Sequence, residues 1–548
     1  MKTIVSSDIS SKRGEVFTRP EIVDYMLATI RHIRQQKDWA QLHVLEPSCG
    51  RGAFVLPLID ALINEVQNWE ASFLPSFLRA CDISWDNIAF VREMLSRRLE
   101  MAGCPLKRKE DLLNTWLICD DFLTHEFNST FDVIVGNPPY IRFDDLSKAK
   151  QQEYTRYYSS FSNRCDIYIP FFEKSLSLLS STGVLAFICA NRFTRNRYGL
   201  KLRKLISQSY HVAVYVNMEH TQPFLEKVSA YPAIFVIDKK IGEPTLAATV
   251  TNLSPKTLAN ISLNKSDNQF SRFATWYQDG EIWTSTDSQE QAEAKNIESV
   301  FPTIEESAVG TRIGIGVASG ADEVFLDAQL NAEIEVDRLI PLVLSEDIKD
   351  GTIIWKHHYL LNPYDASGKN SIINLEQYPK TAAYFNRHAK RLKARYCAKA
   401  TPNEWFRTLD RINYNVYRSA KILLPDIQRG GNVALDEKGE YYPHHNVYWI
   451  ISPSWNLKAL CVILRSSFVT NQIRRVSVQM RGGNVRYQAQ NLRNVHIPSW
   501  NTISSDDVSV LEALYTVSDL SVIDSAVTNL LARVVNLQPQ KLTQGTLF

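Results

Sequence analysis

The feature that most constrains the fold is the alternation of short apolar runs with amphipathic segments over the first 240 residues. Pro20 to Ile33 has apolar residues at helical spacing and a proline suited to the first turn of a helix. The predicted strands, most of them followed by polar or turn residues, are 43–45, 77–81, 116–119, 131–135, 184–189, 211–218 and 233–237. Alternating strands and helices predict an α/β domain with a doubly wound parallel sheet, whose ligands bind at the carboxyl ends of the strands.

The sequence changes character beyond this region. Gly242 to Glu290 is rich in Ser, Thr and Asn, which is typical of a linker or domain edge. Farther along, short β-type runs such as Lys421 to Leu424 alternate with Gly- and Asn-rich turns, and a basic helix is predicted over Ala389 to Arg395. We therefore expect an α/β domain over residues 1–245 and a mixed α+β domain over residues 246–548.

Several classes of protein are excluded by composition. The longest apolar run, Val184 to Ala190, is too short to span a bilayer, and the N-terminus has no apolar signal region. The eight cysteines are scattered without a CxxC pair. We expect a cytoplasmic protein with reduced thiols, no membrane association and no metal-binding residues.

Charge is distributed unevenly along the chain. Residues 251–350 carry 7 Lys/Arg against 18 Asp/Glu, whereas residues 351–500 carry 22 against 8. A basic stretch of this length is typical of a polyanion-binding module. A solvated face on an ordinary domain explains the charge equally well, so charge alone leaves both possibilities open.

The tetrapeptide Asn137-Pro138-Pro139-Tyr140 directly follows a predicted strand. Its prolines have a fixed φ and no N–H, so the loop is stiff and presents carbonyl oxygens. The Asn137 side-chain oxygen and a neighbouring carbonyl can both accept hydrogen bonds from one –NH₂ group, which frees the nitrogen lone pair for attack. Tyr140 adds a ring for stacking. The loop suits a planar amine such as adenine, cytosine or glutamine, although a simple proline-rich turn is the structural alternative.

A glycine turn after the first strand indicates the second ligand. Glu46 to Gly52 connects that strand to a helix, and acidic residues follow the next two strands at Asp82 and Asp121, the latter beside Phe122. Asp82 is placed for a ribose diol, and Asp121 with Phe122 for an adenine ring. The sequence has neither a GxxxxGK[ST] phosphate loop nor full GxGxxG spacing. The predicted ligand is an adenosine without phosphates, as in S-adenosylmethionine.

Together these segments resemble a known family. Gly14 to Met26, the Leu45-Glu46-Pro47 turn, Asp82-Ile83, Asp121 to Leu123 and the Asn-Pro-Pro-Tyr loop are similar, in order, to the motifs of γ-class (TaqI-like) adenine-N6 DNA methyltransferases of restriction–modification systems. The resemblance covers about residues 12–240. It extends more loosely to Arg312–Asp327 and Gln479–Pro498, which look like target-recognition segments.

The resemblance implies a fold and an activity. The fold would be a Rossmann-like S-adenosylmethionine-dependent methyltransferase domain followed by a DNA target-recognition domain. The activity would be methyl transfer from S-adenosylmethionine to N6 of an adenine flipped out of double-stranded DNA. The protein would act as a monomer, with any cognate restriction endonuclease a separate protein.

The same resemblance assigns roles to individual residues. Thr18 would bind the methionine carboxylate of the cofactor, and Glu46 and Gly50 would line its pocket. Asp82 would bind the ribose, and Asp121 and Phe122 the adenine. At the target base, Asn137 and Pro138 would hold the amine, and Pro139 belongs to the same loop. Tyr140 would stack on the base, and Phe224 would be a second aromatic beside it.

Basic and polar residues of the second half are candidates for DNA contacts. Gln479, Arg481 and Arg486 are predicted to read base edges in the major groove. Arg391 and Arg395 on the basic helix are predicted to contact phosphates, which position the protein without specifying sequence.

Two alternatives involve different chemistry. RNA and release-factor glutamine methyltransferases share the catalytic loop, but the large basic second domain favours duplex DNA. Pro425-Asp426 and Asp436-Glu437-Lys438 match the PD…(D/E)xK pattern of metal-dependent nucleases, which would make the protein a bifunctional restriction enzyme. Because 436–439 is predicted to be a hairpin turn between strands 432–435 and 440–442, we expect no cleavage.

Overall fold

The computed structural model describes residues 16–35, 38–162, 165–226, 231–263, 268–327, 333–349, 351–365, 371–477 and 483–536. The chain forms two compact units, Met1–Gln291 and Ala292–Phe548. The boundary therefore lies about 45 residues beyond the expected one at 245/246, because the segment between them belongs to the first unit.

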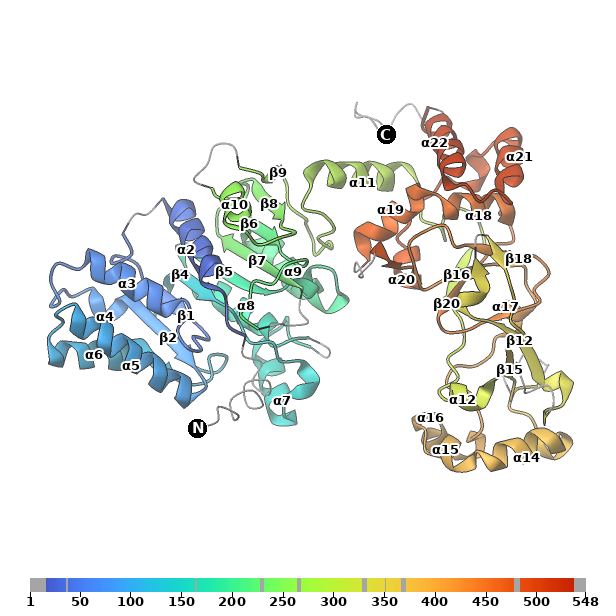
Figure 1. Ribbon diagram of the computed structural model, residues 1–548, viewed down its shortest axis with the longest axis horizontal. Helices are drawn as coiled ribbons and strands as arrows, with labels where there is room; N and C mark the ends of the chain where they lie inside the picture. Colours follow the sequence, from blue (N-terminus) through green and yellow to red (C-terminus); the bar gives the residue numbers. More distant parts are fainter. Residues whose placement is uncertain are drawn as a thin grey trace. The chain divides into compact units, whose positions relative to one another are not determined.

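The first unit contains a nine-stranded sheet of order β3-β2-β1-β4-β5-β7-β6-β8-β9 (Figure 1). Neighbours from β3 to β5 are parallel, and β7 runs antiparallel to both β5 and β6. The strands are β1 (Val44–Glu46), β2 (Leu78–Asp82), β3 (Leu117–Cys119), β4 (Phe131–Gly136), β5 (Leu179–Ala190), β6 (His211–Asn217), β7 (Pro232–Asp238), β8 (Thr245–Thr249) and β9 (Ser271–Phe273). The predicted α/β fold with a parallel core is confirmed.

Helices cover both faces of this sheet. They are α2 (Pro20–Arg34), α3 (Val55–Glu65), α4 (Leu74–Phe77), α5 (Trp85–Met101), α6 (Leu106–Trp116), α7 (Lys148–Tyr157), α8 (Tyr168–Ser177), α9 (Leu200–Ser209) and α10 (Pro255–Asn260). Alternate residues of β4 enter opposite cores: Val133 packs with α2, α3, α5 and α6, whereas Ile134 packs with α7, α8 and α9. This two-sided burial explains why the central strands are continuous apolar runs.

The polar segment 242–290 is not a linker. Within it, β8 pairs in parallel with β6, and β9 pairs antiparallel with β8, so both strands extend the sheet of the first unit. These strands are short and rich in Thr, Ala and Ser, and their partners are distant in sequence or polar themselves. Local periodicity therefore gave no strand signal.

The second unit is mixed α+β. Its strands are β10 (Arg312–Ile315), β11 (Leu326–Asp327), β12 (Leu339–Val343), β13 (Ile348–Lys349), β14 (Thr352–Ile353), β15 (Tyr359–Leu361), β16 (Lys421–Pro425), β17 (Ile427–Gln428), β18 (Ala434–Asp436), β19 (Tyr442–Pro443), β20 (Val447–Ile451) and β21 (Val485–Arg486). They form two four-stranded sheets, β10-β20-β16-β18 and β11-β15-β12-β19, and two short pairs, β13-β14 and β17-β21.

The second unit also contains helices. They are α12 (Asp322–Phe325), α14 (Pro379–Arg387), α15 (Ala389–Lys393), α16 (Tyr396–Ala400), α17 (Tyr414–Tyr417), α18 (Leu457–Arg465), α19 (Ser467–Val476), α20 (Ala489–Leu492), α21 (Ser505–Leu514) and α22 (Leu520–Asn536), while α11 (Ser288–Val300) crosses the boundary between units. The predicted hairpin is wrong, because β18 pairs with β16 and β19 pairs with β12. Among the described residues, no helix is long and apolar enough to cross a membrane.

Candidate active site

A cavity of about 250 Å³ lies at the carboxyl ends of β1, β2, β3 and β4. The strand-end loops predicted to bind the cofactor meet there, as expected for the ligand site of an open parallel sheet. All six predicted cofactor residues line it: Thr18, Glu46, Gly50, Asp82, Asp121 and Phe122. Asn137 and Pro139 of the predicted catalytic loop line the same cavity.

Asp82 fixes the glycine turn after β1. One carboxylate oxygen accepts the Gly50 N–H at 2.8 Å, and the other accepts the Ser84 N–H at 2.8 Å and the Asn87 side chain at 3.1 Å. Gly50 and Gly52 have φ values of 49° and 82°, which other residues rarely adopt. The turn is thus held in one conformation against the end of β2.

Glu46, the last residue of β1, carries an unusual buried carboxyl group. Its side chain is almost fully buried, and Oε2 has no hydrogen-bond partner within the described structure. Burial raises the pKa of Glu46 well above its usual range, the nearby Asp82 charge adds to this, and a backbone hydrogen bond at Val55 opposes it. An acceptor left unpaired in a cavity wall suits a ligand that brings an N–H group or a positive charge.

Asn137 presents an open acceptor beside this cavity. Its Nδ2 donates to the Val16 carbonyl at 2.8 Å and lies 3.3 Å from the Thr18 hydroxyl. These donations fix the amide so that Oδ1, which is buried, has no partner within the described structure. Ser48 donates to the Asn137 carbonyl at 3.1 Å and so ties the loop after β4 to the glycine turn. The arrangement can accept a hydrogen bond from an amine placed in the cavity.

The segment before α2 brings the second predicted aromatic to the predicted catalytic loop. The Arg19 N–H donates to the Pro223 carbonyl at 3.0 Å, and the Leu225 N–H donates to the Phe17 carbonyl at 2.9 Å. The Phe224 and Tyr140 rings consequently meet edge to face, with centroids 5.9 Å apart and planes at 76°. Residues more than 80 positions apart thus form one aromatic pair beside Asn137.

Sequence reasoning missed two polar residues that the α7 helix contributes to the cavity wall, Lys150 and Tyr154. Asp121 Oδ2 accepts hydrogen bonds from Lys150 Nζ at 2.8 Å and from the Tyr154 hydroxyl at 2.6 Å, and both side chains line the cavity. The only signal for them was their spacing of four residues on α7, which places both on one helix face. Beside them, the Phe122 ring packs against Phe171 with centroids 4.9 Å apart.

The predicted DNA contacts have different outcomes. Gln479 and Arg481 lie outside the described residues. Arg486 forms an ion pair with Asp426, and Arg391 is exposed and paired with Glu323 at 2.7 Å. For Arg395 the prediction is wrong. Its side chain is buried, and its guanidinium donates to four backbone carbonyls within 3.1 Å, so it holds the fold together instead of contacting phosphate: Ser319, Leu392, Trp405 and Arg407.

The carboxylates of the nuclease-like motif are paired with basic side chains. Asp436 is buried with Lys421 Nζ at 2.6 Å, and it also accepts the N–H groups of Glu440 and Tyr441. Asp426 is paired with Arg486. Both acids therefore have structural partners, which supports the expectation of no cleavage.

The nine-stranded sheet and its strand-end cavity define the class as Rossmann-like methyltransferases. The Eco57I restriction-modification methylase family matches residues 88–224. The chain is 34% identical to the type II methyltransferase M.BstVI of Geobacillus stearothermophilus, and the alignment covers 94% of this chain and 95% of that protein. It is 33% identical to the type II methyltransferase M.XhoI of Xanthomonas vasicola, and the alignment covers 90% of this chain and 92% of that protein. The chain belongs to the type II methyltransferases of restriction–modification systems.

A solved structure of low sequence identity has the same overall fold. The type IIL restriction–modification enzyme MmeI, solved in complex with DNA, matches 96% of this chain and 73% of its own chain with a TM-score of 0.59 and 12% identity. The cofactor of this chain, as a methyltransferase, is S-adenosylmethionine. The unpaired Glu46 and Asn137 oxygens fit a cavity that receives a ligand of this kind.

Proposed function

We propose that this protein transfers a methyl group to the N6 amine of an adenine flipped out of double-stranded DNA, within a restriction–modification system. The observation that carries the proposal is the buried, unpaired Oδ1 of Asn137 beside the cofactor cavity. Methyl transfer to an amine needs an acceptor for the N–H groups of that amine. The Asn137 amide cannot rotate to pair Oδ1 with another protein group, because Nδ2 is held by Val16 and Thr18.

The mechanism rests on positioning. Asn137 Oδ1 and the Pro138 carbonyl accept the two N–H groups of the amine, which directs the nitrogen lone pair toward the cofactor cavity. Tyr140 and Phe224 supply apolar rings for the base, and Pro139 keeps the loop stiff. S-adenosylmethionine supplies an already activated methyl group, so this chain provides alignment and polarisation. Flipping costs a few kcal/mol of stacking and pairing, which protein–DNA contacts must offset.

The second unit is proposed to bind the DNA. Arg391 is exposed and suited to phosphate, whereas Arg486, Gln479 and Arg481 remain candidates for reading bases. Arg486 must first exchange Asp426 for a base edge. The protein is proposed to act as a monomer, with a cognate endonuclease as a separate protein.

Tritium transfer tests the proposal. The purified protein is incubated with tritiated S-adenosylmethionine and unmethylated bacterial DNA, with and without magnesium, and modified bases are mapped by single-molecule sequencing. We expect label in adenine at one short recurring sequence. Label in cytosine, RNA or a release factor would overturn the adenine-DNA assignment, and fragmentation only with magnesium would establish a nuclease.

Replacing Glu46 by Gln should have two separate effects, one on the stability of the unliganded protein and one on its affinity for S-adenosylmethionine. The pKa of Glu46 is higher in the folded protein than the value of about 4.3 that a glutamate has in an unfolded chain. The contribution of Glu46 to stability is therefore fully present below about pH 4.3 and is lost as the pH rises through the raised pKa of the folded state. Glu46→Gln should abolish this loss in the unliganded protein. It should also weaken S-adenosylmethionine binding by about tenfold to a hundredfold, because a charge-assisted contact is lost.

Calorimetric titration and urea unfolding at several pH values check this prediction. The matched control is Glu70→Gln, an exposed site in the same unit that should change neither quantity. Unchanged cofactor affinity in Glu46→Gln would exclude a direct cofactor contact.

A further inference from the structure

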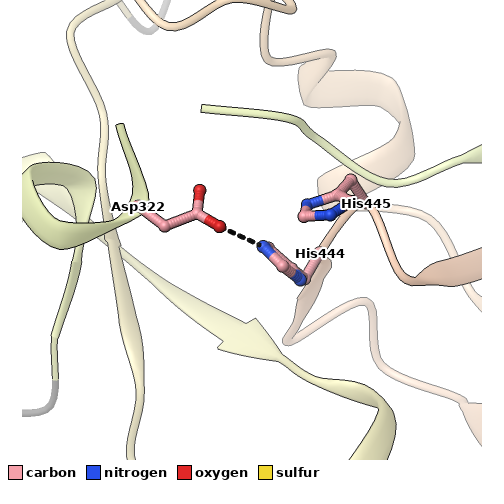
Figure 2. A group of neighbouring side chains, drawn as sticks. All are labelled: Asp322, His444 and His445. Carbon is pink, nitrogen blue, oxygen red and sulfur yellow. Dashed lines mark hydrogen bonds and ion pairs between the residues drawn. The ribbon is translucent and has the colours of Figure 1, made fainter. Parts of the chain in front are cut away.

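A cluster of metal-ligating side chains lies in the second unit, outside the proposed active site. Asp322, at the start of α12, and the consecutive residues His444 and His445, between β19 and β20, each offer one ligand atom, and these atoms all lie within 4.8 Å of one another. Figure 2 shows His444 between the other two side chains. The methyl transfer proposed above has no use for this cluster.

In the neutral ring, the hydrogen bond at Nδ1 leaves Nε2 of His444 as an acceptor. Nδ1 lies 2.9 Å from Asn446 Oδ1, so Nδ1 carries the proton in the neutral ring. The lone pair of Nε2 is then directed at Asp322 Oδ2, another acceptor. A divalent cation placed between these two acceptors would satisfy both.

The separation of these two atoms matches a shared metal ion better than a strong hydrogen bond. Nε2 and Oδ2 are 3.3 Å apart. A charge-assisted N–H···O⁻ bond is shorter, at about 2.7–2.9 Å. Ligand atoms of a tetrahedral zinc ion, each about 2.0–2.2 Å from the metal, lie about 3.3–3.6 Å from one another.

Surrounding groups already orient the ligands, as they do in established metal sites. Asn446 holds the His444 ring through Nδ1, and the Ser319 hydroxyl donates to Asp322 Oδ1, leaving Oδ2 directed at His444 (Figure 2). Outer hydrogen bonds of this kind fix the tautomer and orientation of metal ligands. His445 is exposed, so its ring can turn toward the ion without repacking the core.

We propose that Asp322, His444 and His445 form a binding site for a divalent transition-metal ion of the zinc type, with the fourth position open to water. The N–H of Val317 donates to the Pro443 carbonyl, so the chain before α12 already lies beside the chain before β20. The ion would fasten these two segments and thereby stabilise the second unit.

Binding of metal ions alone tests the site, using full-length protein without a histidine tag. After chelator treatment, Zn²⁺ is titrated in competition with a chromophoric chelator, and Co²⁺ is added to record its visible spectrum. We expect one ion per chain, the intense bands of tetrahedral Co²⁺, and a higher unfolding temperature with Zn²⁺ but not with Mg²⁺.

Variants locate the ion. Asp322→Asn and His445→Ala, both at sites that are not fully buried, should each weaken Zn²⁺ binding at least tenfold. The matched control is His357→Ala, an exposed histidine of the same unit, which should leave binding unchanged. Absence of stoichiometric binding would overturn the proposal, and so would binding that neither Asp322→Asn nor His445→Ala weakens. Methyl transfer plays no part in these measurements, so the proposed function and the metal site can fail independently.

Discussion

Asn137→Ala should lower kcat for methyl transfer by about a thousandfold while cofactor affinity changes only a few-fold. The variant removes the buried Oδ1 that would accept the target amine, and loss of one preorganised hydrogen bond to a reacting group costs about 10²–10³ in rate. It leaves in place Glu46 and Asp82 of the cofactor cavity. Single-turnover kinetics with tritiated S-adenosylmethionine, alongside calorimetric cofactor binding, measure the two effects separately.

Ser48→Ala provides a graded comparison for Asn137→Ala. Ser48 holds the same loop through the Asn137 carbonyl, so its loss should loosen the position of the amide without removing the acceptor. We expect a decrease in kcat of less than about tenfold, the scale of one ordinary hydrogen bond. If Asn137→Ala instead behaves like Ser48→Ala, Oδ1 does not carry the catalytic contact. Equal loss of cofactor binding and rate would indicate that Asn137 serves the cofactor pocket.

The site of the first unit could be predicted because its residues follow buried parallel strands. Parallel strands that are buried on both faces have continuous apolar sequences, and their carboxyl ends lie at one edge of the sheet. Glu46, Asp82 and Asp121 each lie at or just after such a run, and the structure brings all three to one cavity. The Asn137 loop reached the same cavity for the same reason.

Features that depend on distant partners could not be predicted. Nothing near Arg395 in sequence reveals that its guanidinium binds the carbonyls of Ser319 and Arg407, and its basic neighbours suggested an exposed helix face instead. Likewise, the strand at 434–436 pairs with β16, not with the segment just after it. The identity of a tertiary partner is absent from local periodicity and charge, so exposed and buried arginines look alike in sequence.

Lys421→Met should destabilise the second unit by about 3–5 kcal/mol, because it leaves the buried Asp436 charge without its cation. The two side chains are 0% and 1% exposed, and Lys421 Nζ also donates to the carbonyls of Tyr417 and Ser419. Urea unfolding followed by circular dichroism and tryptophan fluorescence measures the change, with the transition of each unit analysed separately.

A neighbouring pair provides the control for Lys421→Met. Lys458 lies 3.3 Å from Glu437 with both side chains more than one-third exposed, so Lys458→Met should change stability by less than about 1 kcal/mol. The contrast also tests the nuclease-like motif, because Asp436 is its central acid. If Asp436 is structural, Lys421→Met unfolds at lower urea and magnesium does not restore the midpoint. If Lys421→Met is as stable as Lys458→Met, or magnesium selectively stabilises it, then Asp436 is available to a metal ion and the nuclease alternative regains support.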